Sequence, residues 1–85
     1  MSRQVVLATL ERFIVEELTD RQRQALVAVE IDEMPLEEAA RRMGTNRNAL
    51  YKLLHDARRR LKRRMMAEGI SPQDLLAAIS ERGTL

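Results

Sequence analysis

The chain has 85 residues and a net charge of +2, with 45% hydrophobic residues and no cysteine. This length allows one domain with a modest core. The lack of cysteine excludes a disulfide framework and a thiolate zinc site. No apolar run approaches the ~20 residues of a membrane span, and the first residues lack a signal-peptide cleavage pattern. We therefore expect a soluble, cytoplasmic protein without a membrane partner.

The composition favours helices over strands. Aromatic residues make up only 2% of the chain, so the core must come from aliphatic residues, alanine and methionine, which suits packed helices. No alternating strand pattern and no Asn-Gly or Asp-Gly turn is present. We predict an all-α fold, with a four-helix helix-turn-helix domain over residues 1–67 and a short C-terminal helical extension over residues 68–85.

Two amphipathic helices are expected in the first third of the chain. The first spans residues 3–17 and has a broad apolar stripe around Phe13. The second spans about 20–31, with Thr19 as its N-cap and Gln22 completing a capping box. The residues that this second helix is expected to bury are Ala25, Leu26, Val29 and Ile31.

A pair of helices joined by a tight turn follows. Pro35 is expected in the first turn of the third helix. Gly44 is expected at its end, because glycine can take the positive φ of a helix C′ position. Thr45 or, better, Asn46 caps a fourth helix over residues 47–67. Its inward positions, at helical spacing, are Leu50, Leu53, Leu54, Ala57, Leu61 and Met65.

Positive charge is concentrated in this helix pair. Residues 41–64 contain ten basic residues and one acidic residue, Asp56, a local charge of +9, whereas the rest of the chain sums to −7. This asymmetry favours a polyanion on one face; the alternative is a solvated helix face. The outward positions expected on the fourth helix are Arg47, Asn48, Tyr51, Lys52, His55, Arg58, Arg59 and Lys62.

A helix-turn-helix places its second helix in the DNA major groove. There, arginine and lysine can bond to guanine O6 and N7, and asparagine can bridge adenine N6 and N7. Each outward residue taken alone is as consistent with an ordinary exposed side chain as with a DNA contact. As a set, we interpret Arg47, Asn48, Tyr51 and Lys52 as base contacts, Arg58, Arg59 and Lys62 as phosphate contacts, and His55 as an exposed residue beside DNA.

The other reactive side chains do not suggest an enzyme or a metal site. His55 is the single histidine and has no carboxylate cluster at ligand spacing. The chain lacks a Gly-rich phosphate loop, a nucleophile elbow and paired carboxylates for acid–base chemistry. We expect no catalytic residue, no metal and no cofactor. DNA phosphate would repel Asp56, although its carboxylate can accept a hydrogen bond from cytosine N4. We favour an i, i+4 ion pair of Asp56 with Lys52 or Arg60.

Residues 18–66 resemble region 4 of bacterial sigma-70-type RNA polymerase sigma factors, most closely the extracytoplasmic-function group. The resemblance rests on the Leu-Thr-x-Arg-Gln-Arg opening at 18–23, the Glu-Glu-Ala-Ala segment at 37–40, the Met-Gly turn at 43–44 and the Ala-Arg-Arg-Arg-Leu end at 57–61. In that family the second helix of the motif binds the −35 promoter element, and other helices dock on the β flap of the polymerase core.

The resemblance also implies roles for individual residues. Base contacts fall on the set already named at the start of the fourth helix, and an anti-sigma factor is a further partner. The resemblance implies DNA backbone contacts by Arg41, Arg42, Arg58 and Arg59, and a polymerase-facing side near Leu26, Val29 and Ile31. Many relatives carry a basic residue where this chain has Asp56, so their promoter preference cannot be transferred.

Several alternatives stay open at this point. The segment 70–83 contains Ser71-Pro72, a helix-start pattern, so we expect a last helix over about residues 72–82. This segment could pack on the core, pair two molecules or cover a binding face; we favour packing. Nothing here is similar to sigma region 2, so we expect either an excised domain, which the Met1-Ser2 start favours, or a protein unable to initiate transcription alone. A LuxR-type regulator output domain and a helical protein-interaction module are the competing interpretations.

Overall fold

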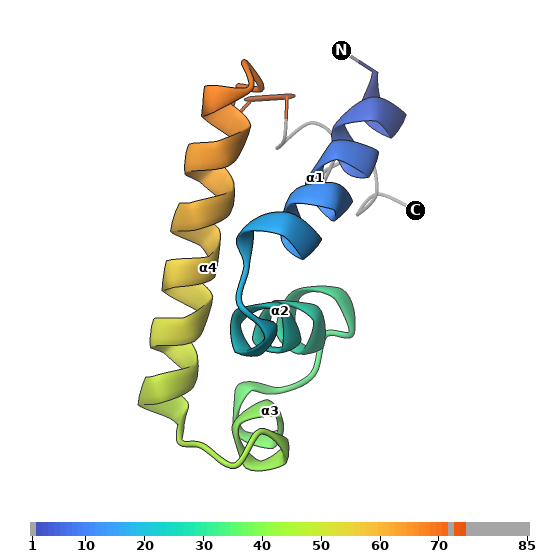
Figure 1. The fold of residues 1–85 in the computed structure, drawn as a ribbon. Helices are drawn as coiled ribbons and strands as arrows, with labels where there is room; N and C mark the ends of the chain where they lie inside the picture. The colour runs from blue at the N-terminus through green and yellow to red at the C-terminus, as the bar shows by residue number, and fades with distance from the viewer. Residues whose placement is uncertain (1, 72, 75–85) are drawn as a thin grey trace.

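The computed structural model describes residues 2–71 and 73–74, in which all regular structure is helical (Figure 1). The predicted all-α helix-turn-helix fold is confirmed over this part of the chain. Most of the helix predicted over about residues 72–82 lies outside the described residues. In chain order, the elements are α1 (Arg3–Glu17), α2 (Asp20–Leu26), the π-helix η1 (Val27–Ile31), α3 (Leu36–Arg42) and α4 (Arg47–Ala67).

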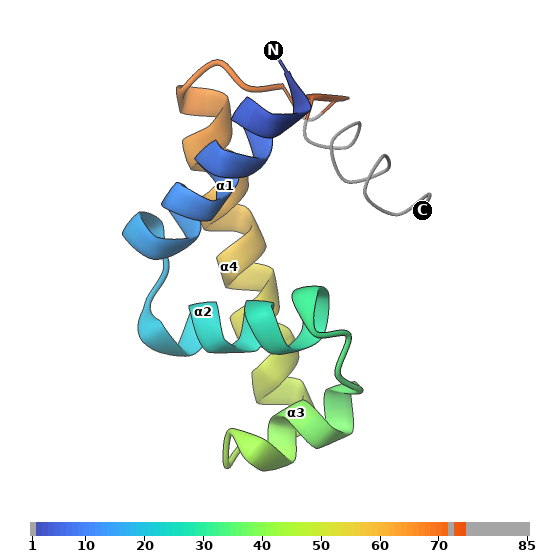
Figure 2. The same cartoon turned by 90° about the vertical axis from the view of Figure 1, so that its right-hand side faces the viewer.

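Helix α4 is the element on which the others are assembled. It packs against α1, α2 and α3, which follow one another along its length, with α2 crossing its middle (Figures 1 and 2). Burying apolar side chains at these contacts is the main source of stability in so small a domain. The largest fully buried side chains come from α1 and α4, namely Val6, Phe13, Leu50, Leu54 and Met65.

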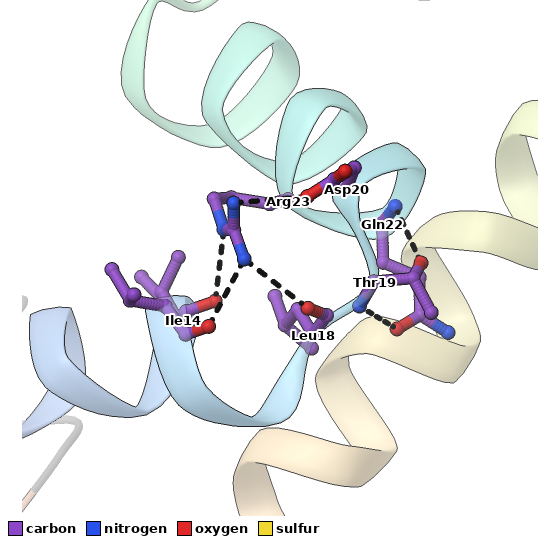
Figure 3. Close-up of polar contacts among 7 residues, drawn as sticks. Ile14, Leu18, Thr19, Asp20, Gln22 and Arg23 are labelled. Atoms are coloured by element: carbon purple, nitrogen blue, oxygen red, sulfur yellow. Dashed lines mark hydrogen bonds and ion pairs between the residues drawn. The ribbon is translucent and has the colours of Figure 1, made fainter.

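Side-chain caps start the helices where the sequence predicted. The Gln22 backbone N–H donates to Thr19 Oγ1 at 3.1 Å, and the Thr19 N–H donates to Gln22 Oε1 at 3.1 Å, which completes the predicted capping box (Figure 3). Asn46 Oδ1 accepts from the Ala49 N–H at 2.8 Å and caps α4. The prediction for Pro35 is wrong by one residue: its ψ of 142° is extended, so it stands before α3.

The turn of the helix-turn-helix depends on Gly44. Its φ is 66°, a left-handed conformation that costs glycine little. The Gly44 N–H donates to the Arg41 carbonyl at 3.1 Å and the Thr45 N–H donates to the Ala40 carbonyl at 2.9 Å, the bond pair of a Schellman motif. A Cβ on Gly44 would meet no heavy atom within 4 Å, so the need for glycine here is conformational rather than steric.

The end of the second predicted helix is a π turn instead of α-helix. The Asp32 N–H donates to the Val27 carbonyl at 2.9 Å, five residues back. In this wider turn, side chains no longer follow the 3.6-residue period from which burial was predicted. The expectation that Ile31 is buried is therefore wrong, since its side chain is 42% exposed. Val29 is half-buried, and Leu26 is buried in the core at 6% exposure.

Arg23 joins α2 to the C-terminal end of α1. Its guanidinium donates to the carbonyl oxygens of Ile14, Val15 and Leu18 at 3.2, 3.0 and 3.3 Å (Figure 3). The last carbonyls of a helix have no partner within the helix, so a charged donor there replaces a cap. These bonds therefore fix the angle at which the chain enters α2.

Candidate nucleic-acid interface

The outward face of α4 is open to solvent, as predicted. Tyr51 is 46% exposed, whereas Leu50 and Leu54 are 0% and 1% exposed. The helix thus turns its leucines inward and its polar side chains outward. The predicted outward residues are all exposed: Arg47, Asn48, Tyr51, Lys52, His55, Arg58, Arg59 and Lys62.

Two predicted base contacts at the start of α4 interact with each other. Arg47 Nη2 donates to Tyr51 Oη at 3.4 Å, and the guanidinium carbon lies 5.7 Å from the centre of the Tyr51 ring. Arg47 Nη1 also lies 3.6 Å from the Glu37 carboxylate on α3. The hydrogen bond with Tyr51 is the main cause that raises the pKa of Arg47. Arg47 is therefore a permanently charged donor held between α3 and Tyr51.

Carboxylates of the same domain also contact two predicted backbone-binding arginines. Arg42 pairs with Glu38 one turn back on α3 at 2.8 Å. Arg58 pairs with Glu30 of η1, a residue from a different element. In the described part of the chain, no carboxylate pairs with Arg41, Lys52, Arg59 or Lys62. The exposed basic face thus combines arginines that pair within the domain with cations that pair with no described carboxylate.

The expected ion pair of Asp56 is absent from the described residues. Neither Lys52 nor Arg60 lies within ion-pair distance of its carboxylate there. Arg60 Nη1 instead donates to Gln22 Oε1 on α2 at 3.5 Å. Asp56 remains half-buried in a depression that also includes Gln22, Arg59, Arg60 and Arg63.

Arg64 belongs to the basic block in sequence but serves the fold. It contacts Glu68 at 3.1 Å, Glu16 at 3.5 Å and Glu17, and it lies 4.4 Å from the centre of the Phe13 ring. The hydrogen bond with Glu17 is the main cause that raises its pKa. The sequence pattern does not distinguish Arg64 from the other arginines of the basic block. Adjacent glutamates at the end of α1 were the available signal.

The remaining predicted site residues are placed as follows. His55 is exposed on α4. Among residues 2–71 and 73–74, no three His, Cys, Asp or Glu residues gather in a way that could hold a metal ion. No described helix is both long enough and apolar enough to span a membrane. Of the predicted polymerase-facing residues, Ile31 is 42% exposed and Val29 is half-buried, while Leu26 belongs to the core.

Comparison with known families identifies the domain. The profile of the family described as Sigma-70, region 4 matches residues 12–61, which is more than half of the chain. This match runs from within α1, through the helix-turn-helix, to Leu61 in α4. Comparisons with curated proteins and with solved structures found no further match. The chain therefore belongs to the Sigma-70, region 4 family, a DNA-binding family of the transcription machinery that recognises the promoter −35 region and interacts with RNA polymerase.

Proposed function

We propose that this domain reads the −35 element of a promoter with the first turns of α4 while the apolar side chains around η1 dock on the β flap of RNA polymerase. The single observation that carries this proposal is the orientation of α4. Its polar residues 47, 48, 51 and 52 are exposed next to leucines with no more than 1% exposure. Grouping with extracytoplasmic-function sigma factors belongs to the same proposal.

Base recognition is assigned to Arg47, Asn48, Tyr51 and Lys52. These residues occupy the N-terminal part of α4, the part of a recognition helix that enters the major groove. Lys52 has no carboxylate partner in the described part, so it can donate to guanine without first breaking an ion pair. The contact of Arg47 with Tyr51 makes these two residues act as a unit.

Backbone contacts are assigned to basic residues on both sides of the base-reading turns. Arg41 and Arg42 end α3, and they flank the turn that precedes α4. Further along α4, exposed cations continue for several turns and can follow the phosphates at the rim of the groove. These cations are Arg58, Arg59 and Lys62, and the exposed side chain of His55 is placed beside the DNA.

Polymerase docking is assigned to the surface around η1. Ile31 is exposed and Val29 is half-buried, with Leu26 beneath them in the core. An exposed isoleucine beside other apolar side chains is suited to an apolar partner. The same surface, or the basic face of α4, is where an anti-sigma factor would bind.

Selection of DNA from a random library tests this proposal. The complete chain, fused to a polymerase flap fragment, should enrich one family of sequences. Replacing Lys52 by alanine should relax the preference at particular positions, at a cost of about 1–3 kcal/mol for the preferred base. The matched control is Lys62→Ala, which should weaken all sequences nearly equally. If Lys52→Ala also weakens all sequences equally, Lys52 does not read bases.

A further inference from the structure

An acidic side chain lies within the proposed DNA-binding face. Glu30 of η1 forms an ion pair with Arg58 of α4, although the two residues are 28 positions apart in the sequence. The side chains of Glu30 and Arg58 are 44% and 55% exposed. Both ends of the pair are therefore reachable from solvent, and a phosphate group can approach Arg58 without any movement of the helices.

The placement of Glu30 follows from the π turn. A backbone hydrogen bond from Asp32 to Val27 closes the five-residue turn η1. This turn continues α2, and α2 packs against α4. The following acidic residues, Asp32 and Glu33, are also exposed, but neither forms an ion pair in the described part of the chain. Glu30 is thus the residue of this acidic segment that engages the basic face.

We infer that Glu30 competes with DNA phosphate for Arg58 and so lowers the affinity of this domain for DNA. The inference rests on the proposed function, because it takes Arg58 as a backbone contact. A phosphate that binds Arg58 must displace the Glu30 carboxylate and not only water. Because Arg58 is already paired with a negative charge in the free protein, binding the phosphate gains less electrostatic free energy.

Removal of the Glu30 charge must be separated from a general loss of negative charge. Glu30→Gln and Glu33→Gln change the net charge by the same amount, three residues apart, but only Glu30 contacts Arg58. Each variant of the complete chain is compared with and without Arg58→Gln. The probe is a fluorescein-labelled duplex of mixed sequence, because phosphate contacts need no particular bases. Binding is followed by fluorescence anisotropy over a range of salt concentrations.

At low salt, Glu30→Gln should bind this duplex about two- to fivefold more tightly than Glu33→Gln, the range typical of an exposed ion pair. In the Arg58→Gln background the two variants should bind equally, and higher salt should reduce the difference. Circular dichroism melts check that all variants remain folded. We expect that they do, because none of the replaced residues is buried.

The outcomes separate this inference from the proposed function. If Glu30→Gln and Glu33→Gln bind equally while Arg58→Gln weakens binding, the competition is overturned and DNA binding by α4 stands. A Glu30→Gln advantage that persists without Arg58 overturns it as well, because simple repulsion is then sufficient. If the parent chain binds no duplex at low salt, both the inference and the proposed function fail.

Discussion

Replacement of Leu50 by alanine tests the orientation of α4 most directly. Leu50 is 0% exposed and lies two residues before Lys52, which faces solvent. A leucine-to-alanine change in a packed core costs about 2–5 kcal/mol, from lost transfer free energy and the cavity left behind. A domain of this size has a free energy of unfolding of roughly 4–13 kcal/mol. The change should therefore remove a large share of the total stability.

Urea denaturation followed by circular dichroism measures this loss. The matched controls are on the same helix: Met66 is 55% exposed and Lys52 is exposed, so alanine at either position should change stability by no more than about 0.5 kcal/mol. Lys52→Ala should nevertheless alter DNA binding. Leu50→Met, which conserves volume and should cost less than about 1.5 kcal/mol, provides a folded protein for the DNA measurement and should keep its base preference.

Two results would refute this reasoning. The first is a Leu50→Ala protein as stable as Met66→Ala, because a side chain on the outward face leaves no cavity. The second is a Lys52→Ala protein that loses stability as the leucine variant does, because Lys52 would then be part of the packing. Either result would mean that the recognition face of α4 is assigned to the wrong side.

Two further predictions concern polar contacts that hold the fold. Arg23→Gln should lower the free energy of unfolding by about 1–3 kcal/mol, because three carbonyls at the end of α1 lose a charged donor. The control is Arg21→Gln, which removes a single 3.4 Å hydrogen bond. If both variants are equally destabilised, Arg23 does not join α1 to α2. Asp74 should titrate below the ordinary aspartate pKa, because its carboxylate is stabilised first by the Ser71 side chain and then by the Ser71 N–H. Its contribution to stability is present above about pH 3.9 and lost as the pH falls through the lowered pKa; NMR titration should show Ser71→Ala raising the Asp74 pKa, and equal values in both proteins would contradict this.

Local signals were sufficient to predict most of the helical framework. The capping box at Thr19 and the Asn46 cap depend on residues three apart, and the turn at Gly44 depends on one backbone conformation. Each can therefore be recognised from residues within a few positions of one another in the sequence. The inward spacing of apolar residues on α4 likewise predicted which side chains face solvent. Pro35 was misplaced by one residue because proline is suited both to the first turn and to the position before it.

The candidate site was predictable in its members but not in their partners. The exposure of Tyr51 and Lys52 follows from helical periodicity alone. Glu30, the partner of Arg58, lies 28 residues away, and Glu17, one of the partners of Arg64, lies 47 residues away. No sequence spacing indicates which helix faces meet. Asp56 illustrates the same difficulty: helix spacing favoured a pair with Lys52 or Arg60, but Arg60 contacts Gln22 on α2.

By itself, the amino-acid sequence determined the helices, their caps, the outward face of α4 and the resemblance to sigma region 4. These properties depend on short-range hydrogen bonds and on the burial period of a helix. Only the tertiary structure decided that η1 is a π turn, that Ile31 is exposed, and that Glu30 lies against Arg58. Such features depend on how separate helices pack against one another, and packing sets which charges come together across the domain.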